Sequence, residues 1–140
     1  MSTSETTAQS ALPLIGRILL ASIFILSGLS KLAAPAATQG YIASAGLPAP
    51  LLAYIAAIVV EAGGGLLLLV GYRTRLAAGV LAAFTLVAAV VFHHAFGDQN
   101  QFIHFFKNLA MVGGLLQVVA FGAGSFSLDN RVGSRTMKVA

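Results

Sequence analysis

The sequence predicts an all-α integral membrane protein, folded as a bundle of four transmembrane helices. Hydrophobic residues make up 58% of its 140 residues and charged residues only 9%, whereas roughly 25% of the residues in a soluble domain are charged. The hydrophobic residues gather in four long segments, each near the ~20 residues that an α-helix needs to cross a bilayer. Short stretches rich in Pro, Gly and polar residues separate the segments, as expected of connecting turns.

The first segment, residues 12–32, follows residues 1–11, which we expect to be a disordered cytoplasmic tail. Charged, small and aromatic residues share one face of this segment at spacings of four and three: Arg17, Ala21, Phe24, Gly28 and Lys31. That spacing is typical of a helix that packs against neighbours. The alternative is a cleaved signal peptide, because "APA" at 34–36 fits a small-x-small cleavage site. Lys31 before that site and the long tail before Arg17 favour a retained helix.

The second segment, residues 51–71, contains a single charged residue, Glu61, which lies close to the predicted midplane. It shares a helical stripe with three small residues: Ala57, Gly64 and Gly65. The carboxylate should therefore face the bundle interior, and an unpaired charge at that depth costs at least about 2.5 kcal/mol. We predict Arg17 as its charge partner, with Lys107 as the alternative. A structural ion pair or neutral acid, and a carboxylate that accepts protons or orients a ligand, are both left open.

The third and fourth segments, residues 76–96 and 102–122, carry three histidines, a lysine and an amide near their outer ends. We predict one polar constellation that opens toward the outer side: Lys31, Glu61, His93, Lys107 and Asn108. His93 and His94 are adjacent and cannot both bind one metal ion on a regular helix. One of them with His104 and Asp98 is an alternative metal site, and no metal is assigned. Otherwise the histidines cap helix ends or serve a proton or quinone-related role.

The connections predict the orientation. Residues 33–50 should form a loop with a short interfacial turn around Tyr41, while 72–75 ("YRTR") and 97–101 ("GDQNQ") form tight turns. Cytoplasmic loops are enriched in Lys and Arg. One side collects Arg17, Arg73, Arg75, Arg131, Arg135 and Lys138, whereas the other holds only Lys31, Lys107 and Asp98. We therefore expect a multi-pass protein of the cell (inner) membrane with both termini in the cytoplasm, the basic tail 131–140 included.

Composition also excludes some classes of function. The net charge of +4 comes from basic residues that stand singly or in pairs without interleaved aromatics, so no nucleic-acid partner is expected. The chain has no cysteine, which removes disulfides, thiolate metal sites and thiol redox chemistry of its own. Any redox role must therefore use a bound partner.

The order of these features resembles a known family. "LIGRILLASIFILSGLSKLAAPAATQGYIASAGLPAP", "VVEAGGGLLLLVGYRTRLAAGVLAAF" and "FIHFFKNLAMVGGLLQVV", followed by "GAGSFSLDNR", are similar to the DoxX family of small four-helix bacterial membrane proteins. The resemblance covers residues 12–130. Some members resemble the membrane part of a thiosulfate:quinone oxidoreductase, and others are associated with oxidative-stress complexes.

The resemblance implies a quinone in the apolar interior, with no cofactor attached covalently. It implies roles for Glu61, His93 and Lys107, which we predict to be catalytic, and for Lys31 and His94. We predict that these last two bind a ligand together with Asn108 and Arg17. Three hypotheses follow: a quinone-handling oxidoreductase subunit, a non-catalytic scaffold that recruits soluble redox partners, and a small-molecule or ion carrier. The expected partners are the lipid bilayer and soluble redox proteins or a second membrane subunit. A homo-oligomer is left open, as is whether the chain is an enzyme.

Overall fold

The computed structural model describes residues 3–136, and no strand occurs within them. The elements in chain order are α1 (Thr3–Ala33), α2 (Pro35–Ser44), α3 (Pro50–Ile58), the π-helix η1 (Val59–Gly63), α4 (Gly64–Val70), α5 (Thr74–Phe92), α6 (Gln99–Phe121) and α7 (Leu128–Thr136). Four helical stretches are long and apolar enough to cross a membrane: Ser10–Ala33, Pro50–Val70, Thr74–Phe92 and Gln99–Phe121. The predicted class, an all-α protein with four transmembrane helices, is confirmed.

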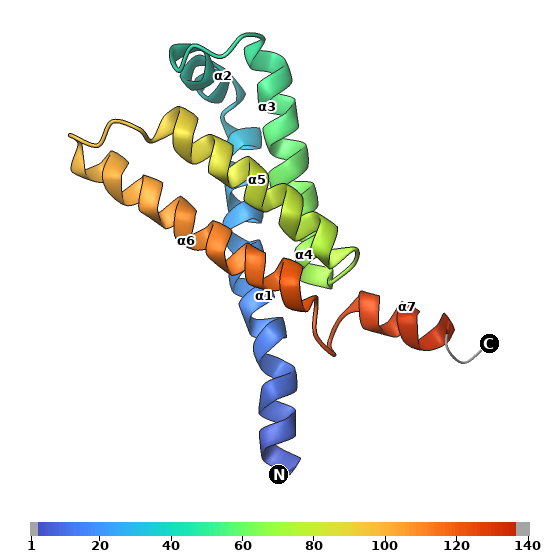
Figure 1. Cartoon of the computed structure of the whole chain (residues 1–140). Helices are drawn as coiled ribbons and strands as arrows, with labels where there is room; N and C mark the ends of the chain where they lie inside the picture. The colour runs from blue at the N-terminus through green and yellow to red at the C-terminus, as the bar shows by residue number, and fades with distance from the viewer. Residues whose placement is uncertain (1–2, 137–140) are drawn as a thin grey trace.

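The helices alternate in direction, so the start of α1 and the end of α6 lie at the same end of the bundle (Figure 1). Helices α3, η1 and α4 run without a break back along α1, and α5 packs against both α4 and α6. At the opposite end α2 lies beside α3, and α7 leads away from the bundle near the C-terminus (Figure 1). The end at which α1 begins and α6 ends is called the basic end below, and the other the α2 end.

The core forms where α1, α4, α5 and α6 meet. Its buried residues are Ala21, Phe24, Leu68, Ala78, Leu81, Ala82 and Leu115. Small residues let the backbones approach: a methyl group on Gly28 would lie 3.0 Å from both Cβ and N of Ala62. A methyl group on Gly65 would lie 2.9 Å from the Ile25 side chain. The small-residue faces predicted for the first two segments are therefore the packing faces.

Three boundaries differ from the predicted ones. Helix α1 begins at Thr3, well before residue 12, because the polar stretch before Pro13 contains no helix breaker. Residues 35–44 form the helix α2 instead of a loop, since Pro35 lies in its first turn, where proline is well tolerated. Helix α5 ends at Phe92, so His93 and His94 follow the helix rather than continue it.

Hydrogen bonds of Asp129 connect two segments of the chain at the basic end. Its carboxylate accepts hydrogen bonds from the backbone N–H groups of Arg73 (2.7 Å) and Thr74 (2.9 Å), at the first turn of α5. Its own N–H donates to the carbonyl of Gly71 at 2.8 Å. The segment 127–131 thus joins the end of the fourth span to the hairpin between the second and third.

Candidate functional site

A cavity of about 440 Å³ lies between the helices toward the α2 end. All four spans and α2 contribute to its wall, which is mostly aliphatic and aromatic. Its strongly polar side chains are Ser27, Lys31, Glu61, His93, His104, Lys107 and Asn108. The structure therefore brings together the five residues of the predicted constellation and adds Ser27 and His104 to them.

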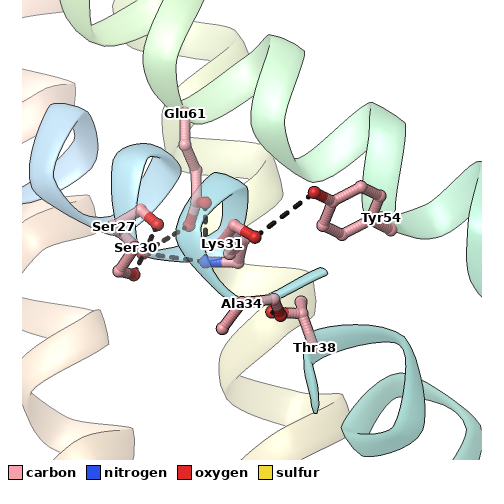
Figure 2. Close-up of polar contacts among 7 residues, drawn as sticks. All are labelled: Ser27, Ser30, Lys31, Ala34, Thr38, Tyr54 and Glu61. Carbon is pink, nitrogen blue, oxygen red and sulfur yellow. Dashed lines mark hydrogen bonds and ion pairs between the residues drawn. The ribbon is translucent and has the colours of Figure 1, made fainter. Parts of the chain in front are cut away.

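Glu61 meets α1 through an ion pair and a hydrogen bond (Figure 2). Its Oε2 lies 2.7 Å from Lys31 Nζ, and its Oε1 accepts a hydrogen bond from the Ser27 hydroxyl at 3.1 Å. Lys31 also donates to Ser27 Oγ at 2.8 Å, which closes a three-residue network. The Glu61 side chain is 9% exposed and that of Lys31 is 24% exposed. Glu61 belongs to η1, and such π-helical turns within α-helices are frequent at functional sites.

The predicted pairing of Glu61 with Arg17 is wrong. Arg17, only 1% exposed, lies at the basic end, where Nη1 donates to the carbonyls of Leu68 (3.0 Å) and Leu69 (3.2 Å). Its Nη2 donates to the carbonyl of Phe126. The cause is the register of the antiparallel pair: Gly28 contacts Ala62, so Glu61 lies level with Ser27 and Lys31.

A second polar group joins the end of α5 to the start of α6. His93 Nδ1–H donates to Gln101 Oε1 at 2.8 Å, and the His93 ring stacks on His104 with centroids 5.2 Å apart. Lys107 Nζ lies 3.0 Å from His104 Nδ1. Because a lysine ammonium can only donate, His104 accepts through Nδ1 in this contact. Lys107, the alternative partner of Glu61, is thus hydrogen-bonded to His104 instead.

Asn108 is a polar group of the cavity wall that lacks a partner among the described residues. It is 8% exposed, and its carboxamide makes no hydrogen bond with any residue that the structure describes. The hydroxyl of Ser27, a partner suggested by its depth, is already bonded within the Glu61 network. A buried amide without a partner is unfavourable. Asn108 therefore offers both a donor and an acceptor to a molecule in the cavity.

Two predicted ligand-binding residues lie elsewhere. Arg17 is held at the basic end, and His94 is exposed, with Nδ1 3.1 Å from the carbonyls of both Val90 and Val91. The alternative metal site does not assemble either. Within residues 3–136 no group of three or more His, Asp or Glu side chains is close enough to hold a metal ion. Asp98 instead caps α6 by accepting from the N–H groups of Asn100 and Gln101.

Sequence reasoning missed the contribution of α2. Thr38, Tyr41 and Ile42 all line the cavity, and the Tyr41 ring stacks on Phe92 with centroids 5.2 Å apart. An aromatic residue at an interface is also typical of an anchor at the lipid headgroups, so Tyr41 carried no specific signal. Ser27 had a usable signal, because it lies four residues before Lys31 and so shares its helix face.

Comparisons with known proteins agree with this architecture. The sequence model of the DoxX family matches residues 12–94. The chain is 39% identical over 116 residues to "Inner membrane protein YqjF" of Escherichia coli strain K12, covering 83% of this chain and 88% of that relative. It is 38% identical over 129 residues to "Inner membrane protein YphA" of the same organism, covering 89% of this chain and 92% of the relative. No solved structure matches.

Proposed function

Because this chain belongs to the DoxX family of membrane proteins, we propose that it binds a quinone in its cavity as the membrane component of an oxidoreductase system. It is a multi-pass protein of the inner membrane, as its relatives and its four spans indicate. The electron donor is a partner protein or a small sulfur compound such as thiosulfate. The chain has no cysteine with which to relay electrons itself.

The main support for this proposal is the Asn108 carboxamide, which has no hydrogen-bond partner among the described residues. This carboxamide lines a largely apolar cavity, and a quinone combines an apolar body with two carbonyl oxygens that accept hydrogen bonds. The volume of about 440 Å³ falls within the roughly 300–1,000 Å³ typical of small-molecule sites. The residues present thus fit the head group of a quinone.

A bound quinone supplies a two-electron, two-proton acceptor, and the residues of the cavity supply its surroundings. The Asn108 amide donates to a carbonyl oxygen and fixes the orientation of the head group. Glu61, ion-paired to the Lys31 ammonium, is the carboxylate of the cavity wall that holds or releases a proton at Oε2. His93 and Lys107 supply further proton-bearing nitrogens at the α2 end of the cavity.

The proposal includes an orientation with both termini in the cytoplasm and the α2 end facing outward. Arg73, Arg75 and Arg131 at the basic end support it, because cytoplasmic segments are rich in Arg and Lys. Single cysteines in place of Tyr72 and Gln99, both exposed, test it. They should react with a membrane-impermeant maleimide from opposite sides, and labelling from one side only would refute this orientation.

The test of function begins with the protein purified in mild detergent. Its lipid extract should contain quinone in near-stoichiometric amount, and the protein with its native membrane partners should reduce a soluble quinone analogue with thiosulfate. Extracts of a four-span control protein, purified in the same way, set the background. Quinone at background level together with no turnover would refute the proposal.

A further inference from the structure

One face of α6 carries features that have no use within a single chain. Helix α6 is the least buried of the four spans, with 11% of its most apolar stretch buried. Five exposed residues follow one another at spacings of four and three: Phe106, Ala110, Gly113, Gln117 and Ala120. These five are called the outer face of α6. Their spacing is that of a helix packed along a partner helix.

Gln117 is a polar group without a partner on this apolar face. It is exposed, and its carboxamide makes no hydrogen bond with any residue in the described part of the chain. By contrast, the exposed hydroxyl of Ser22 on α1 donates to the carbonyl of Leu19 at 2.8 Å, within its own helix. A carboxamide that faces hydrocarbon is stabilised by a hydrogen bond to another helix.

Gly113 lies one turn before Gln117 and is equally unexplained. Nothing lies within 4 Å of a methyl group placed on it, whereas one placed on Gly114 would lie 3.3 Å from the Leu20 side chain. Glycine weakens a helix, so Gly114 has a packing reason in the monomer and Gly113 has none. A glycine in the centre of an exposed face allows a second helix backbone to approach closely.

We infer that two copies of this chain pair through the outer face of α6, with their Gln117 carboxamides hydrogen-bonded to each other. A carboxamide both donates and accepts, so an identical group across a two-fold axis satisfies it. A two-fold interface presents the same face twice, and the outer face carries no charge that would repel its copy. The pairing explains the spacing, the glycine and the amide together. It does not depend on the quinone proposal, because the cavity lies on the opposite side of α6.

Cysteine cross-linking tests this dimer, because the chain contains no cysteine of its own. Ala110→Cys places a thiol on the outer face, and Ala83→Cys places one on the exposed side of α5 as the matched control. In native membranes treated with copper phenanthroline, Ala110→Cys should give at least five times more product than Ala83→Cys. The product should have twice the 14.3 kDa mass of the chain.

Two second-site changes identify the contacts. Adding Gln117→Leu or Gly113→Leu to Ala110→Cys should lower the yield of cross-linked dimer several-fold. The amount of protein should stay the same and its unfolding midpoint should not fall, since a methyl group on Gly113 would meet nothing within 4 Å and Gln117 makes no hydrogen bond with the described residues. Equal yields from Ala110→Cys and Ala83→Cys, a product that contains a different protein, or a yield unchanged by Gln117→Leu would each overturn the proposal.

Discussion

Glu61 is stabilised entirely by one turn of α1, through Lys31 and Ser27. The network lies in the cavity wall, so one arrangement pairs the carboxylate and also places it beside the cavity. The structural and functional interpretations of Glu61 are therefore compatible. Lys107 contacts His104 and forms no ion pair with a carboxylate among the described residues, so its amine is accessible to a ligand in the cavity.

Glu61→Gln tests the ion pair. It should lower the free energy of unfolding by about 2 kcal/mol, less than the roughly 3–5 kcal/mol for breaking a fully buried pair, because the Lys31 side chain is 24% exposed. Adding Lys31→Met should restore part of the loss by removing the unpaired ammonium. Thermal unfolding of the single and double variants in detergent measures both effects. Equal stability of wild type and Glu61→Gln would contradict the structural role.

Asn108→Leu separates binding from stability. The amide makes no hydrogen bond with the described residues, so a leucine of similar volume should leave unfolding unchanged or raise its midpoint slightly. Affinity for a short-chain quinone analogue should fall about tenfold, the effect of losing roughly 1.4 kcal/mol of hydrogen bonding. Titration monitored by fluorescence or calorimetry checks the affinity. A large loss of stability would show that Asn108 is structural.

The sequence predicted the constellation at the α2 end but not the partner of Glu61. Polarity within an apolar segment is visible in the sequence, and it identified five residues that line the cavity, although Lys107 is exposed: Lys31, Glu61, His93, Lys107 and Asn108. Pairing depends on the register between α1 and η1, which is set by the contact of Gly28 with Ala62. Depth counted from assumed helix ends could not resolve that register, so Arg17 was predicted where Lys31 lies.

Among the helices, α1 packs closely against the continuous helical stretch α3–η1–α4. Gly28 allows this close approach of the two backbones. Gly28→Ala should lower the free energy of unfolding by about 1–2 kcal/mol, because the new methyl group would lie 3.0 Å from the backbone N of Ala62. Gly16→Ala on the same helix is the matched control, since nothing lies within 4 Å of a methyl group there. It should be neutral or stabilising. Equal effects of the two changes would refute the predicted close contact.

The hydrogen bonds accepted by the Asp129 carboxylate predict that the stability of the fold depends on pH. Burial raises the pKa of its carboxyl, but hydrogen bonds from Thr74 and Arg73 lower the pKa by more. The net result is a pKa below the ordinary value of 3.8. A lowered pKa in the folded state means stability that is present above about pH 4 and lost as pH falls through the lowered value. Asp129→Ala should lower the free energy of unfolding by about 1 kcal/mol at pH 7, as the loss of a helix cap does.

The difference in unfolding midpoint between wild type and Asp129→Ala should then shrink steadily below pH 4. Asp129→Asn is the control, because it keeps one acceptor oxygen and cannot titrate. Its midpoint relative to Asp129→Ala should not change across the same range. If the unfolding midpoint of wild type still exceeded that of Asp129→Ala by the same amount at pH 2, the contribution of Asp129 would not depend on its charge.

The four spans were predicted to within a few residues of their ends, apart from the start of α1, because apolar length is a direct signal. Two elements at the cavity, α2 and η1, were not predicted. Helix α2 begins at a proline and contains Gly40, so its composition resembles that of a loop. The π-helix η1 keeps the hydrophobic pattern of an ordinary helix, and the run of glycines after Glu61 was the only hint of it.

At the scale of the whole molecule, the bundle separates two polar regions. The basic end is closed by Arg17 and Asp129, which bind backbone groups of neighbouring segments. The α2 end contains the cavity, whose wall combines all four spans with α2. Composition could predict the bundle and the side on which polar groups lie. It could not predict the cavity, because a cavity depends on how side chains from several helices fit together.

Photoaffinity labelling tests directly whether this cavity binds quinone. An azido-quinone analogue is activated on the purified protein, and labelled peptides are located by mass spectrometry. Adducts are expected on cavity-lining residues of α1, α2 and α6, such as Phe24, Tyr41 and Met111, and they should disappear when unlabelled quinone is added in excess. Adducts confined to lipid-facing residues such as Leu19 and Leu116, or labelling that excess quinone does not reduce, would contradict it.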